Sequence, residues 1–113
     1  MPHLLIRGIK AEKMAEISVP LLEELAEICQ CGTDNFKIEC LHSTGVFAGK
    51  VTDSFPFVEV VWFERGQEVR DRFAQAVTRH VHSLGVPEVE ISFSLFQRDS
   101  YYSNGELFVS RRS

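Results

Sequence analysis

Hydrophobic and polar positions follow two different periods along this chain, and each period predicts a type of element. The stretch HLLIRGI at 3–9 is mostly apolar, as expected of a buried strand. The segment 11–29 repeats its apolar residues every three or four positions, which predicts an amphipathic helix. Its apolar stripe consists of Met14, Ile17, Leu21, Leu25 and Ile28. Pro20 should kink this helix, because proline removes one helical hydrogen bond, and the helix is expected to stop near Gly32.

After this helix the period changes to two. NFKIECLH at 35–42 alternates between apolar and polar residues, which is typical of a strand with one buried face. The buried face would hold Phe36, Ile38 and Cys40. The following segment, about 44–55, is predicted to be a loop. It is long enough for a small hairpin around Gly49 and Lys50, or for a flap.

The same order of elements then recurs. PFVEVVWF at 56–63 predicts a second strand, 66–85 a second helix, and VEISFSLF at 89–96 a second alternating strand. Pro2 and Pro56 open the matching strands of the two halves. A helix between two strands is the usual connection of parallel neighbours, so each half is expected to be a right-handed βαβ unit.

The predicted fold class is α/β, with two tandem βαβ units forming a two-layer α+β domain. One domain should cover residues 1–113, divided into a unit at about 2–43, the loop at about 44–55, a unit at about 56–96 and a tail at 97–113. The alternation places two helices on one face of the sheet. The far face is polar, yet the strands at 3–9 and 56–63 also contribute apolar groups to it. Such a face suggests an oligomer that covers part of it.

The composition argues against some classes of protein. The chain has 113 residues, of which 44% are hydrophobic and 25% charged, as in soluble globular proteins. A net charge of −4 argues against a general nucleic-acid binder, and no apolar run is long enough to span a membrane. The three cysteines and the absence of a secretory signal favour reduced thiols and a cytoplasmic location. No metal site is expected from Cys29, Cys31, Cys40 and His42, because their spacing is poor for zinc.

Pro2 has two interpretations. A strand tolerates proline best at its first position, where the missing N–H is not needed, so Pro2 could simply open a strand. If Met1 is removed, Pro2 becomes the N-terminus and its nitrogen becomes a secondary amine that can carry a proton. In an apolar pocket the pKa of such an amine falls towards neutral pH, which suits a general base.

The tandem βαβ pattern, with a proline directly after Met1, resembles the tautomerase superfamily, which includes the family of macrophage migration inhibitory factor. The segments MPHLLIRGI, PFVEVVWFERGQE and YYSNGELF are similar to a small bacterial family of unknown function within that superfamily. The resemblance implies a homotrimer with its active sites at subunit boundaries. It also implies a cofactor-free reaction on a small keto-enol or carboxylate substrate, with Pro2 as the general base.

The candidate site residues follow from this resemblance. Arg65, Tyr102 and Asn104 would bind the developing oxyanion or a substrate carboxylate, and Trp62 and Phe63 would supply apolar walls beside Leu4 and Ile6. Tyr102 and Asn104 match loosely in spacing a tyrosine and an asparagine that reach the neighbouring subunit's site in relatives. The lysine that these relatives carry falls near Thr33 here, where this chain has none.

Several alternatives stay open. The trimer could be a non-catalytic binding or structural module, or the chain could be another ferredoxin-like βαββαβ domain that binds a ligand as a dimer. Arg65 could instead pair with Glu64 or Glu68. Glu59 lies within an apolar strand, where an unpaired carboxylate is costly, so it should either pair with Arg7 or line the channel or the site.

Overall fold

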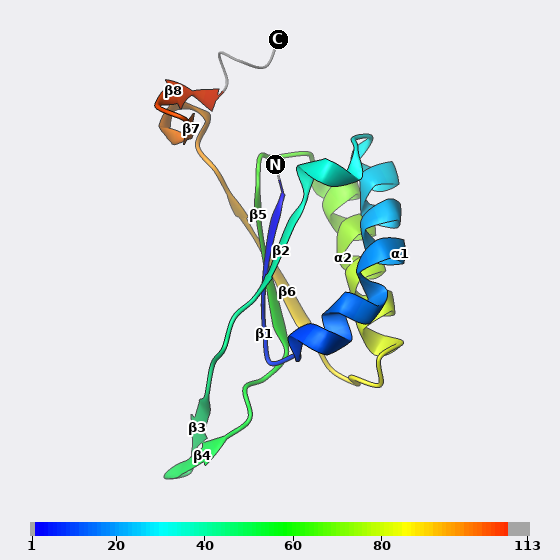
Figure 1. The fold of residues 1–113 in the computed structure, drawn as a ribbon, viewed down its shortest axis with the longest axis vertical. Coiled ribbons are helices and arrows are strands. Elements are labelled where there is room, and N and C mark those ends of the chain that lie inside the picture. The colour runs from blue at the N-terminus through cyan, green and yellow to red at the C-terminus, as the bar shows by residue number, and fades with distance from the viewer. Residues whose placement is uncertain (1, 109–113) are drawn as a thin grey trace.

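The computed structural model describes residues 2–108, and at its centre is a four-stranded sheet with two helices on one face (Figure 1). The strands run in the order β2-β1-β5-β6. Their bounds are β1 His3–Arg7, β2 Lys37–Cys40, β5 Phe57–Trp62 and β6 Glu90–Leu95; the helices are α1 Ala11–Cys29 and α2 Gln67–His82. Met1 and the last five residues of the expected tail, 109–113, lie outside the described residues.

Strand pairing confirms the two βαβ units. β1 is parallel to β2 and β5 is parallel to β6, whereas β1 and β5 meet antiparallel in the middle of the sheet. The two strands of each unit are direct neighbours. In the ferredoxin-like arrangement a further strand separates them, so that alternative is wrong.

Helix α1 has the predicted bounds and the predicted buried stripe. It ends earlier than the glycine signal suggested, because Gln30 rather than Gly32 adopts the left-handed conformation, with φ 56°. The N–H of Cys31 then donates to the carbonyl oxygen of Ala26, which closes the helix end. The helix continues through Pro20, and Figure 1 shows its N-terminal half bent relative to the rest.

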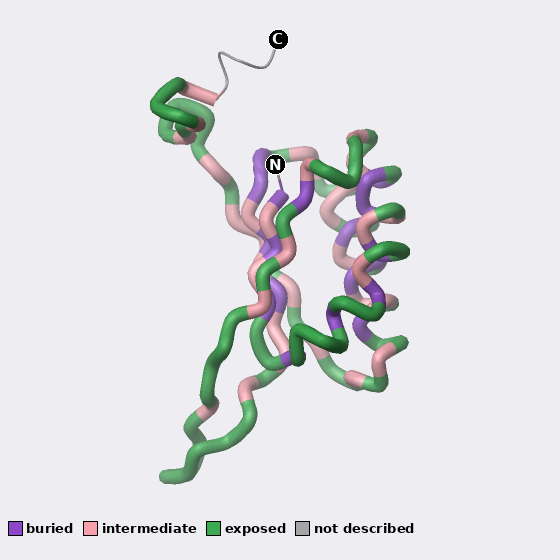
Figure 2. The backbone as a smooth tube through the Cα atoms, in the orientation of Figure 1, coloured by how far each residue is buried: buried purple, intermediate pink, exposed green. Residues whose placement is uncertain are grey.

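The core lies between the sheet and the helices (Figure 2). Alternate residues of β1 and β5 face the helices and are fully buried, namely Leu4, Ile6, Val58, Val60 and Trp62. Helix α2 meets them with its own stripe of Phe73, Ala76, Val77 and Val81. The opposite residues of both strands are half-buried or exposed, as expected of a sheet covered on one face only.

Two small hairpins project beyond the sheet at opposite ends (Figure 1). β3 Gly45–Phe47 and β4 Lys50–Thr52 form the hairpin predicted around Gly49 and Lys50. β7 Tyr102–Ser103 and β8 Glu106–Leu107 form the other, after a short turn of helix, η2 Arg98–Ser100; a similar turn, η1 Thr33–Asn35, precedes β2. Within residues 2–108 no helix is long and apolar enough to cross a membrane.

Candidate functional site

Pro2 lies at the end of the sheet where β1 begins and where β5 and β6 end. This follows from the antiparallel pairing of β1 and β5, in which His3 opposes Val61. Pro2 is less than 2% exposed, and its carbonyl oxygen accepts a hydrogen bond of 3.0 Å from the backbone N–H of Lys37. The start of the chain is therefore anchored to the neighbouring strand and largely shielded from water.

An aromatic cluster stands at the same end of the sheet and consists of Phe63, Phe96, Tyr101 and Phe108. Ring centroids within it lie 4.6 Å apart for Phe96 and Tyr101, and 5.9 Å apart for the stacked pair Phe63 and Phe108. The ring of His3 meets Phe96 edge to face at 5.4 Å, which connects the cluster to the start of β1. These side chains form an apolar wall, and an ionisable group beside such a wall loses hydration.

Two arginines lie at this end of the sheet, each against an aromatic ring. Arg65 donates through Nη1 to the carbonyl oxygen of Phe63 at 2.9 Å, and its guanidinium carbon lies 5.0 Å from the ring centre of Trp62. The guanidinium of Arg98 lies 4.7 Å from the ring centre of Phe63. A planar guanidinium suits a carboxylate or an oxyanion, so this end of an acidic protein can bind an anion.

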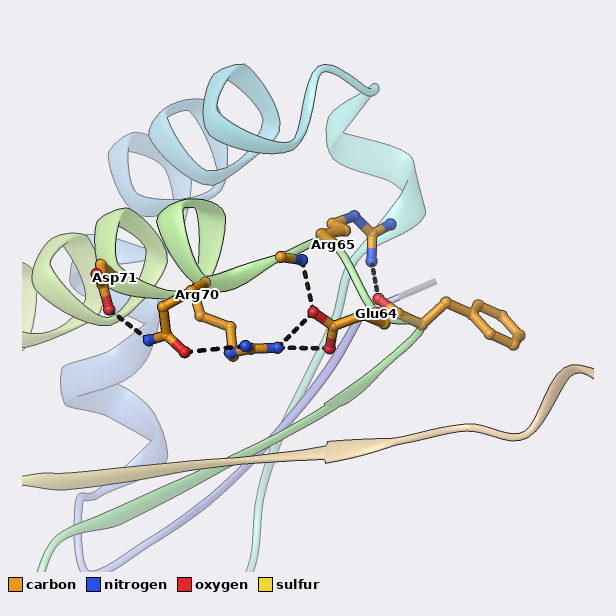
Figure 3. A network of polar contacts seen from close by, with 7 residues as sticks. Glu64, Arg65, Arg70 and Asp71 are labelled. Atoms are coloured by element: carbon orange, nitrogen blue, oxygen red, sulfur yellow. Dashed lines mark hydrogen bonds and ion pairs between the residues drawn. The ribbon is translucent and has the colours of Figure 1, made fainter.

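Arg65 is not paired with Glu64. The carboxylate of Glu64 accepts from Nη1 of Arg70 at 2.6 Å and from the backbone N–H of Gly66 at 2.7 Å (Figure 3). These bonds hold the pKa of Glu64 below its usual value, with the Gly66 hydrogen bond as the larger cause. Figure 3 shows Arg65 turned away from this network and bonded to the carbonyl oxygen of Phe63, so Glu64 does not neutralise its charge.

The titratable groups nearby are held neutral by burial. Desolvation lowers the pKa of His3, and the positive charge of the chain's amino terminus lowers it further, against the opposing effect of Glu39. Burial raises the pKa of Cys29 to about 11. Burial also raises the pKa of Cys40, which pairs with Ile6 away from the Pro2 end of the sheet. Neutral thiols are poor nucleophiles and poor metal ligands. In the described part of the chain, no three His, Cys, Asp or Glu side chains are grouped to hold a metal ion.

The predicted site residues separate into two groups. Pro2, Phe63 and Arg65 share the end of the sheet described above. Trp62 is fully buried on the helix side, where its ring packs on Phe73 and Phe93, and its Nε1 has no hydrogen-bond partner among residues 2–108. The Trp62 side chain therefore lies in the core between the sheet and the helices, beneath this end of the sheet.

Tyr102 and Asn104 lie on the projecting β7–β8 hairpin. Tyr102 is 62% exposed, and Asn104 occupies the hairpin turn with φ 53°, a conformation that asparagine tolerates better than most residues. The residue that enters the aromatic cluster is the neighbouring Tyr101. Sequence reasoning missed His3, Phe96 and Arg98. Only the place of Phe96 at the end of an alternating strand could have indicated one of them.

Of the two roles left open for Glu59, pairing with Arg7 is wrong. Leu5 opposes Glu59 and Phe57 opposes Arg7, so the two charged residues are out of register. The carboxylate of Glu59 accepts from the hydroxyl of Ser94 at 3.3 Å, and the guanidinium of Arg7 lies over the ring of Phe57 at 4.6 Å. Both side chains belong to the open face of the sheet.

A separate hollow of about 480 Å³ lies at the opposite end of the sheet, at the base of the β3–β4 hairpin. Its lining includes the segments 8–10, 41–44 and 51–54 and contains none of the predicted site residues. The lining is mixed, with Ile9, Leu41 and Val51 beside polar side chains, and it comes mainly from loops and the β3–β4 hairpin. We therefore place the candidate site at the Pro2 end, where buried apolar groups and two cations meet.

Comparison with known proteins identifies close relatives. A family model described as a domain of unknown function (DUF1904) matches residues 1–107. The crystal structure of such a domain from Sebaldella termitidis ATCC 33386 is 35% identical, covers 96% of this chain and 100% of its own, and superposes with a TM-score of 0.89. A protein of unknown function from Vibrio cholerae O1 biovar eltor str. N16961 is 29% identical, with coverage of 95% and 87% and a TM-score of 0.84. A search of curated protein sequences found no match.

More distant structures share the fold. An asymmetric trimer of wild-type fused 4-OT is 10% identical, with 98% and 99% coverage and a TM-score of 0.79. FG41 malonate semialdehyde decarboxylase, inhibited by 3-bromopropiolate, is 15% identical, with 100% and 97% coverage and a TM-score of 0.70. At these identities the likeness shows the fold alone. The fold is that of the tautomerase superfamily, and the fold prediction is confirmed.

Proposed function

The chain belongs to the DUF1904 family and has the tautomerase fold, and we propose that it is a cofactor-free enzyme of the tautomerase type. The proposed base is the secondary amine of Pro2, which exists once Met1 has been removed. The proposed substrate is a small keto-enol compound or carboxylate. We further propose that the chain acts as one domain, residues 1–113, in the cytoplasm.

The single observation that carries this proposal is the burial of Pro2 at an end of the sheet that also holds an aromatic cluster and two arginines. An ordinary α-amino group titrates at about 8. Loss of water around it disfavours the charged form, so the pKa falls towards neutral pH. An amine that titrates near neutrality is well suited to accept and return a proton.

The proposed reaction needs no cofactor. The lone pair of the Pro2 nitrogen takes a proton from the carbon next to the substrate carbonyl, the C–H electrons become the C=C bond of an enolate, and the carbonyl oxygen receives the negative charge. Return of the proton to oxygen or to another carbon completes the isomerisation. Arg65 would bind the oxyanion or a carboxylate, and Phe63, backed by Trp62, would exclude water.

We propose that the active assembly is a homotrimer. The relative crystallised as fused 4-OT is a trimer, and this chain has a half-apolar sheet face that no element covers in Figure 1. Tyr102 and Asn104 project from their own chain on the β7–β8 hairpin. In a trimer they would complete the site of a neighbouring copy rather than their own.

A pair of chain forms tests the role of Pro2. One form is processed to begin at Pro2, and the matched control keeps one residue ahead of Pro2, so that its nitrogen remains an amide. Both are treated with 3-bromopropiolate at pH 6 to 8 and analysed by intact mass and peptide mapping. We expect a label on Pro2 in the first form only, with a labelling midpoint below the pH of about 8 typical of an α-amine. The intact mass from the native host should show that Met1 is absent.

Substitution of Arg65 provides a second test with the same reagent. Arg65→Gln should slow labelling about tenfold, as expected for the loss of one charge-assisted hydrogen bond to the reagent's carboxylate. Arg72→Gln, an exposed position on α2, is the matched control and should not slow it. Equal labelling of both chain forms, or a native protein that retains Met1, would contradict the proposal.

The alternative is a non-catalytic trimer that binds a small molecule. It shares the fold and the assembly of the first proposal and differs from it at the Pro2 nitrogen, which is an amide as long as Met1 precedes it. A native protein with Met1 retained that still forms a trimer would support this alternative.

A further inference from the structure

His3 directly follows Pro2, and the proposed function gives it no role. Side chains alternate between the two faces of the sheet along β1: Leu4 is fully buried on the helix side, whereas His3 is half-buried on the open face. The register places Lys37 of β2 on one side of His3 and Val61 of β5 on the other. The imidazole therefore lies at the end of the open face, one residue from the nitrogen proposed as the base.

The ring of His3 belongs to the apolar wall of the candidate site. It meets Phe96 edge to face at 5.4 Å, and Phe96 in turn lies 5.7 Å from Phe63 and 4.6 Å from Tyr101, measured between ring centroids. Imidazole is the side chain that ordinarily gains or loses a proton between pH 5 and 8. The wall beside Pro2 thus contains a group suited to proton transfer.

The imidazole is packed against a ring but has no polar partner in its own chain. Within residues 2–108 no hydrogen bond or ion pair joins either ring nitrogen of His3 to another residue, whereas Nε2 of His80 lies 2.8 Å from Oε1 of Glu24. Shielded polar groups are normally hydrogen-bonded, and a catalytic role is one explanation for an exception. A ligand can bond to the His3 ring without displacing a protein contact.

The surroundings of the ring favour its neutral form. Loss of water is the largest cause that lowers the pKa of His3; the positive charge of the amino terminus and that of Lys37 lower it further, while Glu39 opposes them. Phe96 and Val61 beside the ring carry no charge. A neutral imidazole has one ring nitrogen free to accept a proton.

The proposed isomerisation needs such an acceptor at the substrate oxygen. When an enol returns to the ketone, the protonated Pro2 amine gives its proton to carbon, and the enol O–H must lose its own. Arg65 cannot take that proton, because a guanidinium has no acceptor and stays protonated. The phenol of Tyr102 and the amide of Asn104 are not bases at neutral pH either.

We propose that His3 is a second catalytic residue, which exchanges the proton on the substrate oxygen while Pro2 exchanges the proton on carbon. In ketonisation a ring nitrogen of His3 takes the enol O–H proton, the O–H electrons form the C=O bond, and the C=C electrons take a proton from the Pro2 nitrogen. His3 ends as imidazolium and Pro2 as a neutral amine, so the total charge is conserved, and proton exchange with water restores both. This inference rests on the proposed function.

The first test is the pH dependence of catalysis by the chain processed to begin at Pro2, with the enol of phenylpyruvate as the probe. The kcat/KM for ketonisation should fall at low pH as His3 becomes protonated, and at high pH as Pro2 loses its proton. His3→Gln should lower kcat/KM about a hundredfold and remove the acid limb while keeping the basic limb. His42→Gln, an exposed position at the opposite end of the sheet, is the matched control and should keep both limbs.

The second test does not depend on whether His3→Gln folds. Histidine NMR on the unsubstituted chain should show the His3 ring titrating below the ordinary value of 6.5, with the same midpoint as the acid limb of kcat/KM. For His3→Gln itself, circular dichroism should be unchanged, and 3-bromopropiolate should still label Pro2. Such labelling would show that the loss of rate does not come from a lost amine.

The outcomes separate this inference from the proposed function. The role of His3 is overturned, and the Pro2 chemistry stands, if labelled His3→Gln keeps the wild-type rate and acid limb. The same conclusion follows if the acid limb and the His3 titration have different midpoints, or if a wild type labelled on Pro2 does not ketonise the probe. A wild type that is not labelled on Pro2 overturns both proposals. Loss of the acid limb in labelled His3→Gln, at the midpoint found for His3, establishes His3 as the group at the oxygen.

Discussion

A proline precedes the first strand of each βαβ unit, and the two prolines make the same backbone contact but differ in their position along the chain. The carbonyl oxygen of Pro2 accepts from the N–H of Lys37 at 3.0 Å, and that of Pro56 accepts from the N–H of Glu90 at 3.2 Å. Each proline thus opens its strand and pairs with the second strand of its unit. Pro56 always has an amide nitrogen, whereas Pro2 is one residue from the chain end. The two prolines thus share one structural role, and of the two only Pro2 has a part in the proposed chemistry.

The cores of the units also differ. The first relies on aliphatic side chains of α1, such as Leu21 and Leu25, which are fully buried. The second has an aromatic group of Trp62, Phe73 and Phe93, with ring centroids 4.9 to 5.7 Å apart. Aromatic side chains bury more area each and favour edge-to-face contacts. The second unit therefore concentrates its stabilisation in fewer residues.

The largest expected effect comes from the centre of that aromatic group. Phe73→Ala should lower the free energy of unfolding by about 3–5 kcal/mol, because the cavity lies between two rings that cannot easily close it. Leu21→Ala should cost about 2–5 kcal/mol and less than Phe73→Ala, since flexible aliphatic neighbours relax more readily. Urea unfolding measures both, with the exposed Gln75→Ala as a control near zero. A larger loss in Leu21→Ala would show that the first unit carries more of the stability.

The next effect concerns the turn from strand to helix, which uses a glycine with positive φ in both units. Gly8 has φ 82° and Gly66 has φ 95°. A Cβ at Gly8 would lie 2.5 Å from the carbonyl oxygen of Phe55, whereas at Gly66 nothing lies within 4 Å. Gly66→Ala should therefore cost only the backbone strain, about 1–3 kcal/mol.

Gly8→Ala should cost more than Gly66→Ala, because the backbone at Phe55 must also move. Gly66→Ala thus serves as the matched control for strain without a clash. Thermal unfolding of the two variants gives the comparison. Equal losses would mean that the approach of the Phe55 backbone contributes nothing.

Much of the fold was predictable because the order strand, helix, strand occurs twice in the sequence. The three- and four-residue spacing of α1 gave its bounds, and the alternation of Phe36, Ile38 and Cys40 gave the buried face of β2. The sequence could not define the register between distant antiparallel strands. Glu59 opposes Leu5, so it lies two residues out of register with Arg7. The sequence alone therefore left the pairing of these two residues open.

The candidate site was predictable only where it lies on the strands. Pro2 and Phe63 come together because β1 begins where β5 ends, and the order of elements already implies this. The aromatic cluster depends on how the chain turns after β6 to bring Tyr101 onto Phe96 at 4.6 Å. No regular period marks that turn, because its only regular element is the three-residue helical turn η2.

The smallest expected effect concerns the polar link between the two units. Glu24 on α1 accepts two hydrogen bonds of 3.0 Å from the guanidinium of Arg79 on α2 and lies 2.8 Å from Nε2 of His80. The Arg79 hydrogen bonds, followed by the His80 contact, lower the pKa of Glu24 below its ordinary value of 4.5. Because the folded-state pKa is the lower one, the link stabilises the protein above the unfolded pKa and is lost as pH falls through the folded pKa.

Glu24→Gln should therefore lower the free energy of unfolding at pH 7 by about 1 kcal/mol or less, since the carboxylate is partly exposed and screened by water. The loss relative to wild type should shrink as pH falls below the ordinary glutamate pKa of 4.5 and the wild-type carboxylate becomes protonated as well. Urea unfolding at pH 7 and at pH 3 measures this, and Glu23→Gln on the exposed side of α1 is the matched control. A loss of the same size at both pH values would mean that Glu24 joins the units through its packing, and that its charge does not connect them.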